Sequence, residues 1–337
     1  MNILADFEQQ GSRELYARDY VYQIKRLAHP NLHSPLAGLL GEYILGFKDY
    51  RELVLAKIEE QASDSWLDLH EIPMQGLTVL DEHRYRIRLK GIYPQFIYWL
   101  SMPFFSPIPW EADKFYAQEG MNERNISFNW YPIGTGPYML AENNPNLRMV
   151  LEKNPNFHGE NYPSDGEDID RNNGMLDDAG KPLPFVDRIV FSLEKESIPY
   201  WNKFLQGYYD KSGISSDSFD QSVKLTTQGE FGLTEAMQTQ GIQLASAVAT
   251  SLFYIGFNMQ DEVVGGDTER ARLLRRAISI AVDYDEFIAI FQNGRGVPAH
   301  GPVPPGIFGF EEGESGINPY VYEWSKSRQV RRDIEDA

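Results

Sequence analysis

The sequence has no cysteine and no long apolar run. Without cysteine there can be no disulfide, no thiolate zinc site and no cysteine nucleophile. The apolar runs are short, as at residues 96–100, whereas a membrane-spanning helix needs roughly 20 apolar residues. The first residues after Met1 turn acidic at once, and they lack the charged and then apolar pattern of an export signal. Taken by itself, that start predicts a cytoplasmic protein, unless it is not the natural amino terminus.

Positive charge is also scarce. The chain has 31 Lys and Arg residues against 49 Asp and Glu residues, a net charge of −18. Such a protein repels phosphates unless it carries a strong local basic patch. The two arginine-rich stretches lie at 270–276 and 328–332, and the arginines of the first share a predicted helix with an apolar stripe. We therefore expect no nucleic-acid partner.

The remaining composition is that of a folded globular protein. Of the 337 residues, 42% are hydrophobic and 24% are charged, and the length allows roughly two domains. Apolar spacing predicts a helix at 14–28 that Pro30 ends, and a helical stretch at 36–58 that is interrupted at Gly46. Alternation predicts strands at 84–90 and 147–151, and 189–193 reads as a more buried strand. Without strict alternation of strands and helices, the pattern favours an α/β protein with mixed sheets and flanking helices.

Two loops and one longer run stand out. Residues 101–110 are too rich in proline for regular structure, and 161–184 form a long acidic loop. Residues 251–305 predict a short strand at 251–258, a Gly-Gly turn and two helices. Asp267 or Thr268 is expected to cap the first helix, and Asp283 the second, which Gly294 closes. None of the residues in this run is of a catalytic type, so we interpret it as binding scaffold.

The chemical motifs are weak. Residues 134–136 begin like a phosphate loop, but a strand pattern follows where the anion would need a helix N-terminus. The stretch from 168 resembles a calcium loop, yet the positions for Gly and Glu hold Asn173 and Ala179. His29 and His33 have a metal-ligand spacing, but Pro30 ends the helix between them. We expect no metal and no cofactor, and we find no nucleophile with its base.

Aromatic residues make up 13% of the chain, with clusters at 93–99, 104–105 and 253–254. Aromatic side chains beside proline-rich loops can line an apolar ligand cleft, although most such residues simply pack in a core. Two alternatives to a binding protein stay open. One is a carbohydrate-active enzyme with an aromatic-lined cleft and a carboxylate pair. The other is a calcium-stabilised interaction module centred on 161–184.

Five segments, in the same order, resemble the family 5 extracellular solute-binding proteins, which are the peptide-binding receptors of bacterial ABC importers. They lie at 15–30, 80–96, 134–156, 198–210 and 256–305 and together span nearly the whole chain. The chain departs from the family pattern at three positions. Tyr284 follows Asp283 where arginine is usual, Arg18 replaces an acidic or polar residue, and His29 replaces an aspartate.

The resemblance implies a fold like that of the type II periplasmic-binding proteins, built on three lobes. Residues 1–102 would form most of the small second lobe, 103–250 a segment of the first lobe, and 251–337 the start of the third. Family members begin with an export signal and continue well beyond the pattern matched here. The chain is therefore expected to be a middle fragment, truncated at both ends, of a periplasmic or extracellular, membrane-anchored protein.

The resemblance also implies a function. Family members are not enzymes; their lobes close around an extended peptide, which they deliver to the membrane permease of an ABC importer. The ligand-binding residues expected here are Phe104 and Phe105 on the first crossing between lobes, and Tyr254, Phe257 and Asn258 on the second. The family's acidic anchor for the peptide's amino terminus lies outside this chain. We expect a monomer with a peptide ligand.

Overall fold

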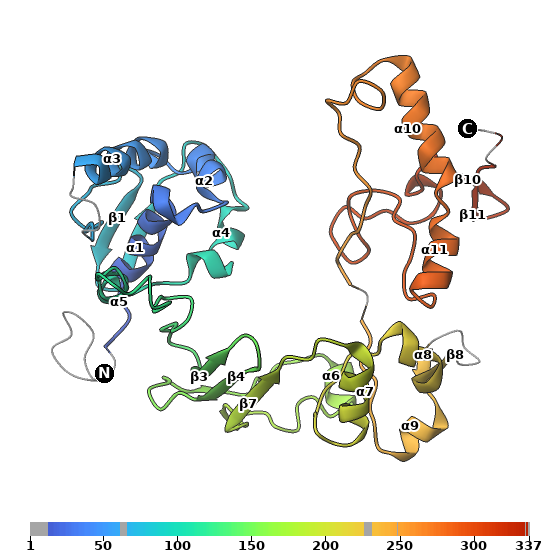
Figure 1. Cartoon of the computed structure of the whole chain (residues 1–337), viewed down its shortest axis with the longest axis horizontal. Coiled ribbons are helices and arrows are strands. Elements are labelled where there is room, and N and C mark those ends of the chain that lie inside the picture. The colour runs from blue at the N-terminus through green and yellow to red at the C-terminus, as the bar shows by residue number, and fades with distance from the viewer. Residues whose placement is uncertain (1–12, 61–65, 226–230, 248, 334, 336–337) are drawn as a thin grey trace. The chain divides into compact units, whose positions relative to one another are not determined.

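The computed structural model describes residues 13–60, 66–225, 231–247, 249–333 and 335. Two compact units divide the chain, Met1–Leu193 and Glu194–Ala337, here called unit 1 and unit 2 (Figure 1). Helices and small sheets occur in both, which confirms the α/β class. The three-lobe boundaries at 102 and 250 stay a prediction.

Unit 1 begins with helices. Helix α1 (Ala17–Leu27), the short η1 (Pro30–Leu32), α2 (Ala37–Tyr43) and α3 (Phe47–Glu60) follow one another along the chain. The helix predicted at 14–28 is thus confirmed, and the break predicted at Gly46 separates α2 from α3. Gly46 has a φ of +71°, a left-handed conformation that glycine adopts without strain.

A hairpin and three short helical segments complete this part of unit 1. Strands β1 (Leu77–Asp81) and β2 (Arg84–Ile87) pair antiparallel, and α4 (Phe96–Trp99), η2 (Pro103–Phe105) and α5 (Trp110–Tyr116) follow. The strand predicted at 84–90 is realised as β2 and an isolated bridge from Leu89 to Ile44. The core that these elements share with α1–α3 is apolar and tightly closed. It contains Val21, Tyr22, Ile24, Leu27, Leu40, Ile44, Phe47, Tyr50, Val54, Leu69, Ile72, Phe96 and Phe105.

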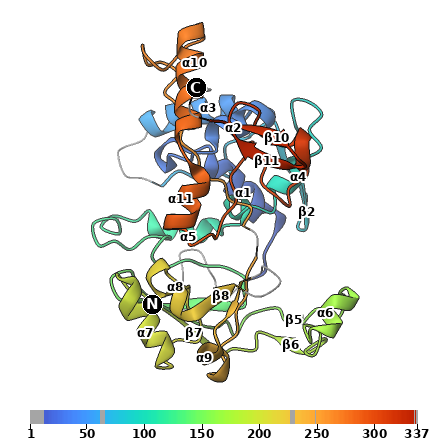
Figure 2. The same ribbon diagram turned by 90° about the vertical axis from the view of Figure 1, so that its right-hand side faces the viewer.

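The rest of unit 1 is a three-stranded antiparallel sheet in the order β3-β4-β7, from β3 (Tyr138–Asn144), β4 (Arg148–Lys153) and β7 (Arg188–Ser192). The predicted strands at 147–151 and 189–193 are both present, but the expectation that 189–193 is the more buried one is wrong, because most side chains of β7 are exposed. Strand β3 follows residues 134–136, as a turn there requires. The connection from β4 to β7 contains β5 (Glu160–Asn161), α6 (Asp168–Asn172) and β6 (Pro182–Leu183), seen close together in light green in Figure 2.

Unit 2 has small sheets and a small core. Its elements are α7 (Ser197–Leu205), α8 (Ser216–Ser222), β8 (Val223–Leu225), β9 (Phe231–Leu233), α9 (Glu235–Thr239), α10 (Glu269–Ala281), α11 (Tyr284–Phe291), η3 (Gly313–Ser315), β10 (Tyr322–Ser325) and β11 (Arg328–Arg331). One cluster of buried side chains consists of Trp201, Leu233 and Met237. The β10-β11 hairpin is tied to the start of α11, where Arg331 pairs with Asp283 and the Tyr322 hydroxyl donates to Asp285.

The helix caps follow the sequence prediction. Thr268 Oγ1 accepts a hydrogen bond from the Ala271 amide at the start of α10, so Thr268 and not Asp267 is the cap. Asp283 Oδ1 accepts from the Glu286 amide at the start of α11. Both bonds satisfy amides that have no partner inside their helix. Gly294 follows α11 with a φ of +73° and donates to the Ile288 carbonyl.

The prediction of a strand at 251–258 is wrong. This segment belongs to no strand, and its side chains are largely exposed. A strand requires a second strand beside it to accept and donate its backbone hydrogen bonds, and the described part of the chain supplies none. Among the described residues, no helix is both long and apolar enough to cross a membrane.

Candidate ligand-binding residues

The five residues expected to bind a ligand fall into two groups. Phe104 and Phe105 lie on η2 in unit 1, whereas Tyr254, Phe257 and Asn258 lie in the segment 251–258 of unit 2. Each group is therefore described within its own unit.

On η2 the two neighbouring phenylalanines point to different surroundings. Phe105 is only 4% exposed and packs edge-to-face against Phe96 in the core, with ring centroids 6.4 Å apart. Phe104 is 44% exposed. A ligand can therefore touch the Phe104 side chain, while Phe105 anchors η2 to the core. The sequence could not distinguish these roles, because adjacent aromatic residues give no sign of which one is buried.

Side chains and one backbone carbonyl of α1 hold the chain segment from η2 to α5. Gln23 Nε2 donates to the Phe104 carbonyl oxygen at 2.8 Å, and the Asp19 carbonyl accepts from the Ile108 amide at 3.4 Å. Asp113 in α5 accepts hydrogen bonds from the Tyr22 hydroxyl at 2.7 Å and Arg26 Nε at 2.8 Å. Burial, together with the nearby Asp113 carboxylate, raises the pKa of Tyr22 and keeps its hydroxyl a donor.

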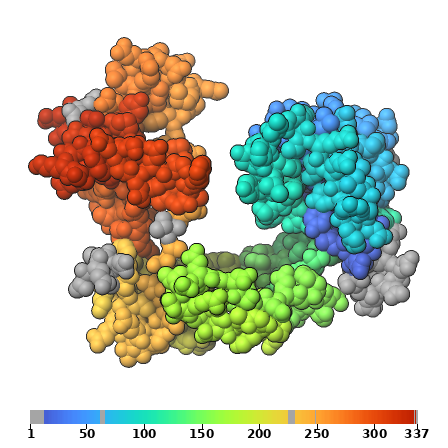
Figure 3. All heavy atoms as spheres, turned by 180° about the vertical axis from the view of Figure 1, so that it is seen from behind, coloured from blue at the N-terminus to red at the C-terminus, as the bar shows by residue number. Residues whose placement is uncertain are grey.

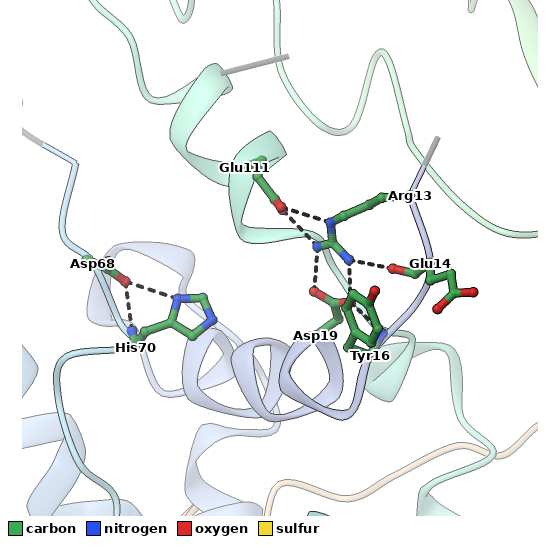
Figure 4. Close-up of polar contacts among 7 residues, drawn as sticks. All are labelled: Arg13, Glu14, Tyr16, Asp19, Asp68, His70 and Glu111. Atoms are coloured by element: carbon green, nitrogen blue, oxygen red, sulfur yellow. Dashed lines mark hydrogen bonds and ion pairs between the residues drawn. The ribbon is translucent and has the colours of Figure 1, made fainter. Parts of the chain in front are cut away.

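A buried ion cluster ties α5 to the residues around the start of α1 (Figure 4). The Arg13 guanidinium donates to both carboxylate oxygens of Glu111 at 2.8 Å and to those of Asp19 at 2.7 and 2.8 Å. Asp19 also accepts from the Tyr16 amide. Burial alone would lower the pKa of Arg13, but the hydrogen bonds to Asp19 and Glu111 outweigh it and raise that pKa. Because Arg13 hydrogen-bonds both oxygens of each carboxylate, this pair is poorly suited to act as the acid and base of a glycosidase.

An open, shallow hollow of about 400 Å³ lies on unit 1 beside β2 and α4. Its lining is apolar and aromatic, formed by Tyr85, Ile87, Leu89, Tyr93, Pro94, Phe96, Ile97 and Leu100. The teal surface around α4 is visible in Figure 3. The lining includes no carboxylate, so this hollow does not provide the acidic pair that the carbohydrate-enzyme hypothesis requires.

In unit 2, the segment 251–258 presents aromatic side chains to solvent. Tyr254 is 81% exposed, and Phe257 is half-buried. Asn258 has a different role, because its Oδ1 accepts a hydrogen bond from the Gln260 amide and its carbonyl accepts from the Asp261 amide. Asn258 therefore begins a turn, and its side-chain oxygen is already engaged by the Gln260 amide of that turn.

Sequence reasoning missed two residues that shape the loop after Asn258. Asp261 Oδ1 accepts from the Val263 and Val264 amides, and the hydrogen bonds from Val264 and Val263 lower the pKa of Asp261. Arg275 in α10 reaches back, and its Nη1 donates to the carbonyls of Val264 at 2.6 Å and Gly266 at 3.0 Å. The aspartate before the Gly-Gly pair was a readable turn signal, but nothing local marks Arg275.

In the acidic loop 161–184, some carboxylates are engaged by the chain itself. Asp170 accepts from the Glu167 amide at the start of α6, and Asp178 pairs with Lys181. Within the residues that the structure describes, no group of three or more His, Cys, Asp or Glu residues could hold a metal ion. The calcium-module hypothesis therefore gains no support from this loop.

Comparison with known proteins identifies relatives along most of the chain. The family model described as bacterial extracellular solute-binding proteins, family 5 Middle, matches residues 9–330. The periplasmic oligopeptide-binding protein OppA of Salmonella typhimurium is 24% identical over 315 residues, covering 93% of this chain and 46% of that protein. The heme-binding protein A of Haemophilus influenzae is 22% identical over 76% of this chain and 39% of that protein. The chain thus spans less than half the length of these relatives.

Solved structures agree on the fold. The periplasmic binding protein DppA from Helicobacter pylori, in complex with the peptide STSA, is 17% identical with a TM-score of 0.55 over 96% of this chain and 50% of that one. The murein tripeptide binding protein MppA of Escherichia coli is 17% identical with a TM-score of 0.55, over 91% of this chain and 48% of that one. These likenesses confirm the expected type II periplasmic-binding-protein fold. The chain belongs to the bacterial extracellular solute-binding proteins, family 5.

Proposed function

We propose that this chain is part of a receptor that binds peptides and delivers them to the permease of a bacterial ABC importer. The observation that carries the proposal is the family match over residues 9–330. Relatives described as oligopeptide-binding, and a structural neighbour solved with a bound peptide, support peptides as the ligand class. The receptor is a monomer without enzymatic activity, and it acts in the periplasm or outside the cell, anchored to the membrane.

The chemistry of the two candidate groups suits an extended peptide. The backbone of 251–257 pairs with no strand, so its amides and carbonyls can hydrogen-bond the main chain of a ligand. Tyr254 and Phe104 offer flat, exposed surfaces on which side chains of differing size can pack. Water in such a site fills the space that smaller side chains leave. Closure of lobes around the peptide then biases a hinge equilibrium toward the bound form.

Thermal unfolding tests the ligand class in the protein purified from its native gene. Because a ligand that binds only the folded protein stabilises it by mass action, peptides at about 100 times Kd should add about 2.7 kcal/mol. We expect an equimolar library of tri- to pentapeptides to raise Tm. Disaccharides and hemin, tested in parallel, should leave it unchanged. A shift with disaccharides or hemin alone would refute the peptide assignment.

Single substitutions test the two groups. Phe104→Ala and Tyr254→Ala should each weaken peptide binding about tenfold, the effect of removing about 1.4 kcal/mol of contact energy. Neither should change the Tm of the unliganded protein much, because both side chains are exposed. Phe308→Ala, which removes an exposed phenylalanine of unit 2 outside both groups, is the control. Equal losses in all three variants would show that the residues contribute no specific contact.

A further inference from the structure

We propose that Gln23 is a positioning residue for ligand binding, because its buried amide fixes the η2 backbone from which Phe104 meets the peptide. The inference rests on the proposed function and adds a residue that does not itself touch the ligand. Gln23 lies in α1, is 6% exposed and is 81 residues from Phe104 in the sequence. Its Nε2 lies 2.8 Å from the Phe104 carbonyl oxygen. That oxygen can only accept, so the side-chain NH2 must face it.

The other end of the same amide is unusual. Gln23 Oε1 is buried and has no hydrogen-bond partner among the described residues. A buried acceptor without a partner destabilises a fold, and an apolar side chain of similar volume would avoid that penalty. Gln23 is therefore a poor choice for stability at this position. The hydrogen bond to Phe104 is what a leucine here could not provide.

The geometry of η2 explains why that hydrogen bond matters. The segment is a single turn, with the Phe105 amide donating to the Met102 carbonyl and the Ser106 amide donating to the Pro103 carbonyl. So short a turn has little rigidity of its own. The Phe105 side chain fixes one point in the core, and Gln23 fixes the peptide unit between Phe104 and Phe105. Together these two anchors determine the direction in which the Phe104 side chain projects.

The other contacts from α1 to this segment hold later residues. The Asp19 carbonyl holds the Ile108 amide, and Arg13 links Asp19 to Glu111 (Figure 4). These contacts would keep α5 in place after loss of the Gln23 amide, so the change should stay local to η2. A Gln23→Leu variant is thus expected to fold with a nearly unchanged Tm and to present Phe104 less accurately.

A double-mutant cycle tests the proposal in the protein purified from its native gene. The probe is the tightest-binding peptide of the tri- to pentapeptide library, and its Kd is measured for wild type, Gln23→Leu, Phe104→Ala and the double variant. We expect Gln23→Leu to weaken binding about threefold to tenfold, and to have no further effect once Phe104 is alanine. A merely structural role would instead weaken binding equally in both backgrounds, which would overturn the proposal.

Gln118→Leu is the control. Gln118 follows α5, is exposed, and donates its side-chain amide to the carbonyl of Phe115 in α5 at 2.9 Å. Its loss should leave the peptide Kd unchanged. The proposal is overturned if Gln23→Leu behaves like Gln118→Leu, or if Phe104→Ala has no effect on Kd.

Amide hydrogen exchange separates a failure of this inference from a failure of the proposed function. Without peptide, the Phe105 and Ser106 amides should exchange faster in Gln23→Leu than in wild type, because η2 has lost an anchor. Unchanged exchange would overturn the positioning role even if peptides bind. If no peptide binds the wild-type protein, the proposed function fails, and the exchange result still decides whether Gln23 holds η2.

Discussion

At the scale of single residues, α1 buries polar side chains whose hydrogen-bond partners could not be predicted from the sequence. Lys25 shows this most clearly. Its Nζ donates to the carbonyls of Leu69 at 2.9 Å, His70 at 3.3 Å and Ile72 at 2.7 Å. Burial lowers the pKa of Lys25, and the three carbonyls accept the three protons that the charged ammonium offers. A helical periodicity shows which side chains share a face, but not which distant carbonyls will meet a lysine.

His29, at the end of the same helical region, gives a pH prediction. Burial lowers its pKa below the ordinary value of 6.5; Asp113 opposes this shift, and Arg26 and Arg51 add to it. The unfolded chain therefore binds the proton more tightly than the folded one. His29 stabilises the fold fully above pH 6.5, and that stability is lost as the pH falls below it.

We therefore expect His29→Gln to reduce the loss of Tm between pH 7.5 and pH 5.0. His158→Gln, at an exposed histidine paired with Glu160, is the control. Differential scanning calorimetry across this range checks the prediction. An unchanged pH slope in His29→Gln would refute it.

At the scale of elements, the start of α10 distinguishes two capping candidates. The sequence left Asp267 and Thr268 open, and the structure gives the bond to Thr268. We expect Thr268→Ala to lower the free energy of unfolding by about 1 kcal/mol and Thr268→Ser to preserve most of it. Asp267→Ala should have a much smaller effect. Urea unfolding of the three variants measures the difference, and a larger loss for Asp267→Ala would reverse the assignment.

The helix α1 and the strands β2, β4 and β7 were predictable from the sequence, whereas the strand expected at 251–258 is absent. Helix α1 was recognisable because its hydrogen bonds are local and its apolar spacing is regular. Residues 251–258 have the composition of a strand, but a strand also needs a partner, and composition does not supply one. Composition also did not show which side chains of the candidate site are exposed. Phe104 and Tyr254 are exposed as a binding role requires, whereas Phe105 is buried and Asn258 forms a turn.

At the scale of the whole molecule, the two units differ in how much of their structure is buried. Eight residues of α1 in unit 1 are buried, including Val21, Ile24 and Leu27, whereas α11 in unit 2 has none. Because local opening is easiest where few apolar contacts must break, the units should differ in stability.

Hydrogen exchange measured by mass spectrometry checks this difference. We expect the amides of α1 to exchange slowest and those of α11 to exchange much faster under native conditions. Helix α3, also in unit 1 but with fewer buried residues, should be intermediate. Equal protection of α1 and α11 would show that burial within the units does not govern their stability.

The ion cluster of Arg13, Asp19 and Glu111 also has a consequence for synthesis. Glu111 follows Arg13 by 98 residues, so a ribosome working at roughly 5–20 residues per second needs about 5 to 20 s to reach it. Helix formation takes only about a microsecond or less. For these seconds Arg13 and Asp19 can already pair, but the second carboxylate does not yet exist. The synthesis of Glu111, and not the formation of α1, therefore sets the earliest time at which this ion cluster can be complete.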